Sequence, residues 1–98
     1  MILYEVIVEV EGASSPAVEE HMRRRHIPAI FATGCFRKIR FQRAASHRFR
    51  TTYEAETAAD LDRYLRDHAP GMRAEFLAEF PTGVRLTRET WHVLEGWG

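Results

Sequence analysis

The sequence His-Ile-Pro-Ala-Ile-Phe-Ala-Thr-Gly-Cys-Phe, at residues 26–36, joins a polar helical segment to a strand-like segment. Proline restricts the preceding residue to extended conformations, so a helix that arrives at this point should stop or kink at Ile27. Pro28 can then open a second short helical turn, which Gly34 can end with a left-handed cap. We therefore predict two helical pieces around Pro28, followed by a turn into a strand.

The segment before this corner predicts a strand and a helix. Residues 2–10 alternate between apolar and mixed positions, which is typical of a strand with one buried face. Ser15 has the residue type of an N-cap and Pro16 follows it, so a helix should run from there to about His26. The buried face of this helix and the short piece after it should contain Val18, Met22, Ala29 and Ile30.

The segment after the corner predicts a β-hairpin. Residues 36–43 alternate as a strand, and residues 47–56 do so again after a short break at residues 44–46. Two strands so closely joined should pair in an antiparallel hairpin. On the second of them, one face should contain Phe49, Thr51, Tyr53 and Ala55.

The C-terminal part predicts a broken helix and a last strand. Thr57 is a candidate N-cap, and Asp60 three residues later makes an acidic variant of the capping box. Pro70 should interrupt this helix, and the turn at residues 81–83 should start a strand over residues 84–94. The buried face of the two helical pieces should contain Leu61, Tyr64, Leu65, His68, Met72, Phe76, Leu77 and Phe80.

The resulting order is β-α-β-β-α-β in a single domain over residues 1–98, and the two halves correspond at an offset of 42 residues. This order is typical of a split β-α-β sandwich, an α+β fold with a four-stranded antiparallel sheet and helices on one face. The other sheet face would be exposed and carries apolar side chains, which a homodimer would cover. The corresponding pairs are Ser15 and Thr57, His26 and His68, and Pro28 and Pro70.

Length and composition limit the function classes. The chain has 98 residues and one cysteine, Cys35, which excludes an internal disulfide and a multi-cysteine zinc site. The first residues lack the basic flank and apolar run of a signal peptide, so we expect a cytoplasmic protein. No run approaches the roughly 18 apolar residues of a membrane span, so we expect no membrane association.

Charge is balanced overall but unevenly distributed. The segment from His21 to Tyr53 holds nine positive charges and no acidic residue. The flanks hold 14 acids and five bases. A basic block can mark an anion or nucleic-acid surface, or it can lie against the acidic flank of a partner copy. RNA-recognition domains share the predicted element order, but residues 47–54 lack the glycine of their basic-glycine-aromatic signature. Nucleic-acid binding is therefore not expected.

A group of short segments stands out at residues 2–6, His26-Ile27-Pro28, residues 33–36, Tyr64-Leu65, His68-Ala69-Pro70 and Arg73. Together they resemble a small bacterial family known only as a domain of unknown function. This family is similar to the dimeric α+β barrel proteins, which implies a ferredoxin-like fold with two sheets packed face to face. Relatives in that superfamily include cofactor-free monooxygenases, haem-degrading enzymes, lactone isomerases and stress-induced proteins. The resemblance implies no particular catalytic residue.

Six residues are candidates for the polar wall of a ligand pocket, because they combine titratable groups with apolar surroundings. The two histidines and the glutamate among them have structural alternatives: a histidine at a helix end can bind free carbonyls, and Glu5 can pair with Arg48 or Arg50. His21 lies five residues from the first candidate histidine, not three or four, so we expect neither a metal site nor a cofactor. The candidates are Glu5, His26, Arg50, Tyr53, His68 and Arg73.

Three function classes remain open for this small homodimer. The first is a protein that binds a small apolar or anionic ligand in the barrel pocket. The second is a cofactor-free enzyme of the monooxygenase or isomerase type, which a cavity with an unpaired acid or histidine would favour. The third is a non-catalytic protein-interaction module, which a filled interface with every polar group matched would favour.

Overall fold

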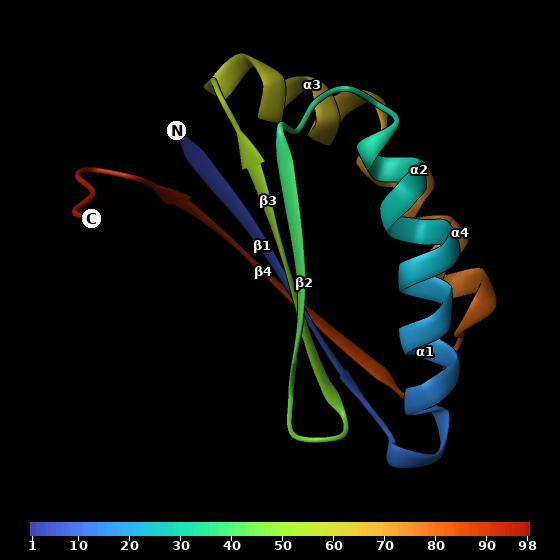
Figure 1. The fold of residues 1–98 in the computed structure, drawn as a ribbon. Coiled ribbons are helices and arrows are strands. Elements are labelled where there is room, and N and C mark those ends of the chain that lie inside the picture. Colours follow the sequence, from blue (N-terminus) through green and yellow to red (C-terminus); the bar gives the residue numbers. More distant parts are fainter.

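The computed structural model describes residues 1–98, and its four strands and its helices follow the predicted order (Figure 1). Two short elements were not predicted: η1 is a 3₁₀ turn and η2 is a turn of π-helix. The elements are β1 (Ile2–Val10), η1 (Gly12–Ser14), α1 (Ser15–His21), η2 (Met22–His26), α2 (Ile27–Phe31), β2 (Lys38–Ala44), β3 (Arg48–Ala55), α3 (Ala58–Asp67), α4 (Ala69–Glu79) and β4 (Val84–His92).

The strands form one antiparallel sheet in the order β2-β3-β1-β4, and all helices cover the same face of it (Figure 1). This confirms the predicted α+β, ferredoxin-like architecture. The two central strands, β1 and β3, come from the two halves of the chain, as the β-α-β-β-α-β order requires. None of the helices is both long enough and apolar enough to cross a membrane.

The core lies between the sheet and the helices. The predicted inward face of β3 is confirmed, because Phe49, Thr51, Tyr53 and Ala55 are all buried. Side chains alternate between the two faces of a strand, so the same rule places Tyr4 and Val8 of β1 in the core. One apolar cluster surrounds Tyr53 towards α3, and a second surrounds Phe49 towards α1.

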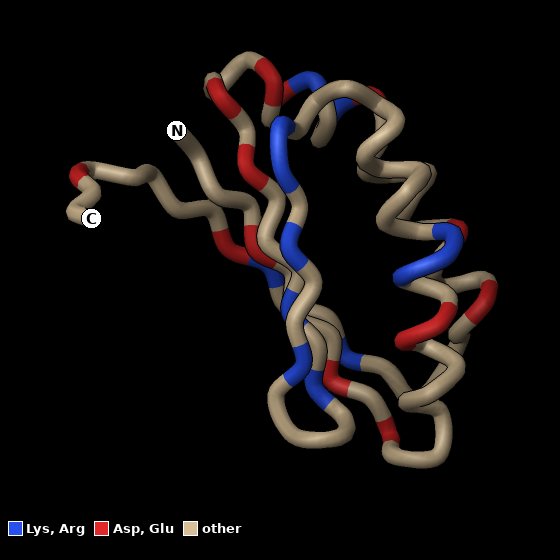
Figure 2. The backbone as a smooth tube through the Cα atoms, viewed as in Figure 1, with Lys and Arg blue, Asp and Glu red and all other residues tan.

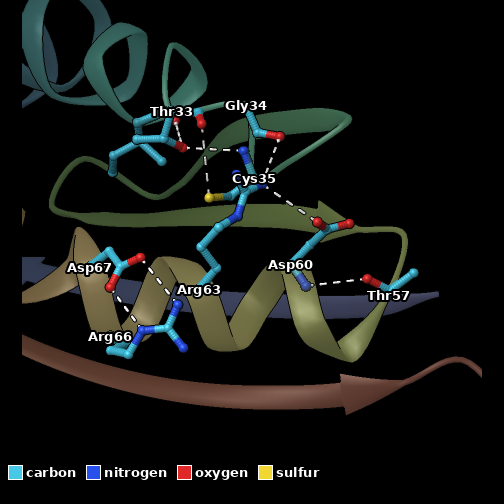
Figure 3. A network of polar contacts seen from close by, with 9 residues as sticks. Thr33, Gly34, Cys35, Thr57, Asp60, Arg63, Arg66 and Asp67 are labelled. Carbon is cyan, nitrogen blue, oxygen red and sulfur yellow. Dashed lines mark hydrogen bonds and ion pairs between the residues drawn. The ribbon is translucent and has the colours of Figure 1, made fainter.

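Only one of the two predicted N-caps is correct. The Thr57 hydroxyl accepts a hydrogen bond from the Asp60 backbone N–H at 3.2 Å, which confirms the cap of α3 (Figure 3). Ser15 does not cap α1, because η1 extends the helical conformation one turn earlier. The Ser15 hydroxyl instead donates to the backbone oxygen of Ser46, which ties the start of α1 to the β2–β3 loop.

The prediction of a helix break is confirmed at Pro70 and wrong at Pro28. His68 has a non-helical backbone conformation (φ −124°, ψ −39°) and separates α3 from α4, whose first turn contains Pro70. Ile27 stays helical (φ −65°, ψ −45°), so the chain continues from α1 through η2 into α2. The turn of π-helix just before Pro28 shifts the hydrogen-bond register where proline lacks an N–H and crowds the preceding turn.

Some predicted bounds and buried positions are wrong. β2 begins at Lys38 because Phe36 turns into the core, where its ring contacts Tyr64 at 4.8 Å between centroids. β4 ends at His92, the register partner of Ile2, because past this pair only the start of the chain is left, where the Val93 N–H bonds to the Met1 oxygen at 3.1 Å. The helices present Ile30, Tyr64 and Phe76 to the sheet, and the positions directly before and after such a residue are rotated away by about 100°. The predicted core residues Ala29, Leu65 and Leu77 are therefore exposed.

The outer sheet face is partly apolar and strongly charged. Strand register places Leu3 beside Trp91, which is 49% exposed, and Ile7 beside Arg50. Glu5 lies opposite Glu89, so two carboxylates face each other across β1 and β4. Basic residues lie along β2 and β3, which form the other half of the sheet (Figure 2). They include Lys38, Arg40, Arg48 and Arg50.

Candidate functional site

A cavity of about 40 Å³ lies between the sheet and the helices, lined by 14 residues of which 11 are hydrophobic. Its walls come from β1, β3 and β4 on one side and from η2, α2, α3 and α4 on the other. The cavity therefore occupies the seam between the two layers. The three lining residues that are not hydrophobic are His26, Arg73 and Arg88, and three of the hydrophobic residues, Tyr4, Tyr53 and Tyr64, carry a hydroxyl group.

The structure brings three of the six candidate residues together. His26, Tyr53 and Arg73 all line the cavity, although they come from η2, β3 and α4. Tyr53 is there because it lies on the inward face of β3, and Arg73 because α4 places it one residue after the cavity-lining Met72. The structure thus places a histidine and a tyrosine on one cavity, which is the arrangement that a polar pocket wall requires.

The other three candidates lie elsewhere. Glu5 and Arg50 are on the outer sheet face, where their side chains approach to 3.8 Å, so the predicted alternative of an ion pair is confirmed. Arg50 also donates two hydrogen bonds to the side-chain oxygen of Gln42, at 2.9 and 2.7 Å. His68 stacks on the Tyr64 ring, with 6.2 Å between centroids, behind the cavity wall.

Three tyrosines form a cluster at the inner end of the cavity. The Tyr4 ring lies 5.9 Å from that of Tyr53 and 6.2 Å from that of Tyr64. Burial, and next the neighbouring Tyr64, raise the pKa of Tyr53 far above its ordinary value of 10. Burial, and next Tyr4, raise the pKa of Tyr64 in the same direction. At neutral pH both phenols are therefore hydrogen-bond donors and not phenolate bases.

An alkaline titration should reveal these two phenols. Above pH 10 the unfolded chain releases tyrosine protons that the folded chain retains, so stability should fall as pH rises, by about 1 kcal/mol per pH unit for each buried tyrosine. Denaturant unfolding at pH 9 and pH 11 measures this loss, and Tyr53→Phe should reduce it. Ionisation of all three tyrosines near pH 10 in the folded protein, followed by absorbance at 295 nm, would contradict the assignment.

A second cluster of titratable groups adjoins the cavity and consists of His21, His26 and Glu75. The Nδ1–H of His26 donates to Oε2 of Glu75 at 3.2 Å, and Nε2 of His21 lies 2.9 Å from Oε1. The alternative that His26 binds free helix carbonyls is wrong, because η2 continues into α2 and leaves no helix end there. The cluster instead connects α4 to the first helical segment, the continuous run of α1, η2 and α2 over residues 15–31.

Burial and hydrogen bonding set the charge states of this cluster. Burial lowers the pKa of His26, against the opposing effect of its hydrogen bond to Glu75. Burial acts to raise the pKa of Glu75, but the hydrogen bond from His26 and the proximity of His21 outweigh it, so the net pKa is lowered. At neutral pH the site therefore combines a neutral imidazole with a carboxylate.

Sequence reasoning missed several of these residues. Arg88 has a usable signal, since it interrupts the inward positions of β4 between Leu86 and Thr90. Tyr4 is the strand partner of Tyr53 and follows from the register of β1 and β3. Glu75 has no local signal, because its role depends on how α4 packs against the first helical segment.

A wider surface groove of about 770 Å³ runs between the first helical segment and β2. Its walls include Ile27, Phe31 and Phe41, and Glu19 accepts a hydrogen bond from Arg43 at 2.9 Å beside them. None of the six candidate residues lines this groove. The three candidates that the structure brings together line the smaller cavity between the layers.

Comparison with solved structures supports the fold. NE2512, a protein of unknown function from Nitrosomonas europaea, has a TM-score of 0.79 at 13% identity, with 98% of this chain and 91% of that chain covered. A candidate antibiotic biosynthesis monooxygenase from the same organism has a TM-score of 0.73 at 14% identity, covering 97% and 100%. A dimeric ferredoxin-like protein from an uncultured marine organism has a TM-score of 0.67 at 18% identity, covering 98% and 97%.

No curated protein matches the chain in sequence. These three solved structures share 13–18% sequence identity with the chain, so their similarity shows the fold alone. A family model does match, over residues 1–94, which is nearly the whole chain. The chain therefore belongs to the family described as Domain of unknown function (DUF4286).

Proposed function

We propose that this protein binds a small aromatic anion in the cavity between the sheet and the helices. The observation that supports this most is the graded polarity of the cavity wall. Buried Tyr53 and Tyr64 lie at the inner end, whereas Arg73 and Arg88 are exposed. An apolar body with a single acidic group matches this gradient, because the ring contacts tyrosines while the anion reaches guanidinium groups.

The size of the cavity limits the ligand. A volume of about 40 Å³ has room for a few water molecules, each of which needs about 10–15 Å³ of this kind of space. A ring the size of benzoate therefore requires lining side chains to move. Met72 and Leu86 are half-buried at the wall, and the flexible thioether of methionine adapts readily to a new neighbour.

The binding test compares two arginines on one strand. Benzoate should bind the wild type, and Arg88→Gln should weaken binding by about tenfold because a charge-assisted hydrogen bond is lost. Arg85→Gln is the matched control, since Arg85 lies on the same strand but outside the cavity. Isothermal titration calorimetry measures both, with neutral benzamide as a probe that should bind more weakly.

Equal affinities of the two variants, or tighter binding of benzamide than of benzoate, would contradict an anion site at Arg88. Absence of saturable binding for every small aromatic acid tested would remove the ligand-binding proposal. The non-catalytic interaction module would then be the better account of the fold.

A cofactor-free oxygenase or isomerase is a second candidate, favoured by His26. A neutral imidazole on a cavity wall can accept a proton from a bound ligand. The monooxygenase-like neighbour supports the fold part of this proposal only. Turnover that His26→Gln abolishes while binding persists would distinguish an enzyme from a binding protein.

We also propose that the protein is a homodimer packed through the outer sheet face. Leu3, Ile7 and Trp91 expose apolar surface there. Basic residues gather along β2 and β3 (Figure 2), whereas the register places the carboxylates of Glu5 and Glu89 side by side on β1 and β4. A twofold axis can place the basic side of one copy on the acidic side of the other. The dimeric ferredoxin-like neighbour supports this assembly.

A further inference from the structure

We propose that His21, His26 and Glu75 bind a divalent first-row transition metal ion, with Zn²⁺ as the best match. Two imidazoles and one carboxylate are the donor set of many zinc sites. Their ligand atoms all lie within 4.8 Å of one another. The two imidazoles approach the same carboxylate, His21 beside Oε1 at 2.9 Å and His26 beside Oε2 at 3.2 Å, so one carboxylate can serve an ion held between the two rings.

The buried nitrogen of His21 is a second, independent indication. Its side chain is only 6% exposed, and Nε2 has no hydrogen-bond partner although Oε1 of Glu75 lies 2.9 Å away. The nitrogen is close to the carboxylate but is not aligned with it. Two donor atoms that converge on a common ion have this relation, since each points at the ion and not at the other. A buried imidazole nitrogen without a partner is otherwise costly.

The turn of π-helix explains why two histidines five residues apart can share an ion. In an α-helix, residues at i and i+5 diverge, whereas a π turn closes its hydrogen bond from i to i+5. The Ile27 N–H bonds to the Met22 oxygen in this way, one residue after the histidine pair at positions 21 and 26. Pro28 explains the position of the turn, since its ring cannot fit the regular α-helical ladder. The prediction of no metal site used α-helical spacing, which does not hold here.

The surroundings suit a partly open site. Phe80 lies 5.4 Å from the His21 ring and Phe76 lies 5.5 Å from the His26 ring, both edge-on, so the imidazoles are held by apolar neighbours. The Glu75 side chain is 43% exposed, which gives an ion a path from solvent. Three protein ligands leave a fourth position for water or a ligand atom, as in catalytic zinc sites. His26 would bind through Nδ1 after its proton moves to Nε2.

The competing explanation is a hydrogen-bonded cluster that only connects two helices. Metal titration of tag-free protein separates the two. Zn²⁺ should bind one ion per chain by calorimetry, and Co²⁺ should give the visible absorption of a low-symmetry site. Glu75→Gln and His21→Gln should each weaken Zn²⁺ binding by at least about tenfold. Glu79→Gln on the same helix and His68→Gln at the corresponding position of the other half are matched controls that should bind as the wild type does.

Two results would overturn the proposal: no saturable Zn²⁺ binding by the wild type, or unchanged binding by the Glu75→Gln variant. Glu75 is partly exposed, so its variant should fold even if loss of buried His21 destabilises the chain. The proposal does not depend on the proposed aromatic-anion site. His21 and Glu75 do not line the cavity, but Glu75 bonds His26, which does. The aromatic-anion site is therefore judged by Arg88→Gln on metal-free protein and the metal site by Glu75→Gln, and either site can fail alone.

Discussion

Replacing Phe49 by alanine should lower the free energy of unfolding by about 3–5 kcal/mol. Phe49 is 1% exposed near the start of the central strand β3, and its ring stacks on Phe41 with 5.5 Å between centroids. Its removal leaves a cavity between β3 and the first helical segment, where Val18 and Met22 cannot close in without breaking their own contacts. Urea denaturation monitored by circular dichroism measures the change.

Phe31→Ala is the matched control for this substitution. Phe31 is 55% exposed on α2, so its loss should change stability by no more than about 0.5 kcal/mol. If Phe49→Ala also lowered the free energy of unfolding by no more than about 0.5 kcal/mol, the apolar cluster around Phe49 would not be a packed core.

Placing a lysine at Ile7 should convert the proposed dimer into monomers at micromolar concentration. Ile7 lies on the central strand β1, in the middle of the outer face and beside Arg50. A lysine there would bury an unpaired charge next to another positive charge, which should weaken association by at least about a hundredfold. Wild-type protein should sediment at twice the chain mass of 11.4 kDa, and the variant at that mass.

Leu65→Lys is the control for the dimer experiment. Leu65 is a partly exposed apolar residue on α3, on the side of the molecule away from the outer sheet face. Its variant should remain dimeric. A monomeric wild type, or an Ile7→Lys variant that stays dimeric, would count against packing through this face.

Much of the fold follows from local patterns. The alternation in β1 and β3 predicts their inward faces because side chains on a strand alternate, and one buried face fixes the register. Thr57 predicts the start of α3 because a hydroxyl there satisfies a free N–H. Pro28 misleads because proline is compatible with a helix when the preceding turn changes its hydrogen-bond register.

The candidate site was less predictable for a different reason. His26, Tyr53 and Arg73 share one cavity because three elements pack together, and no local spacing encodes that packing. Glu5 was placed with them although strand alternation puts it on the opposite face from Tyr4. The same alternation, applied strictly, would have excluded Glu5 and Arg50 and added Arg88.

The pairing of His21 with His26 depends on a single turn of π-helix. A standard α-helical spacing separates the two rings, so the sequence alone argued against a shared site. Recognising Pro28 as a cause of π-helical turns, and not only of helix ends, is the physical rule that would have found it.

The most direct test of the proposed function is a nuclear magnetic resonance titration of isotope-labelled protein with benzoate. We expect the largest shift changes in the ring signals of Tyr4, Tyr53 and Tyr64 and in the backbone of β4 around Arg88, because these groups line the cavity. Shift changes confined to the basic outer strands β2 and β3, or none at saturating benzoate, would contradict a ligand site between the sheet and the helices.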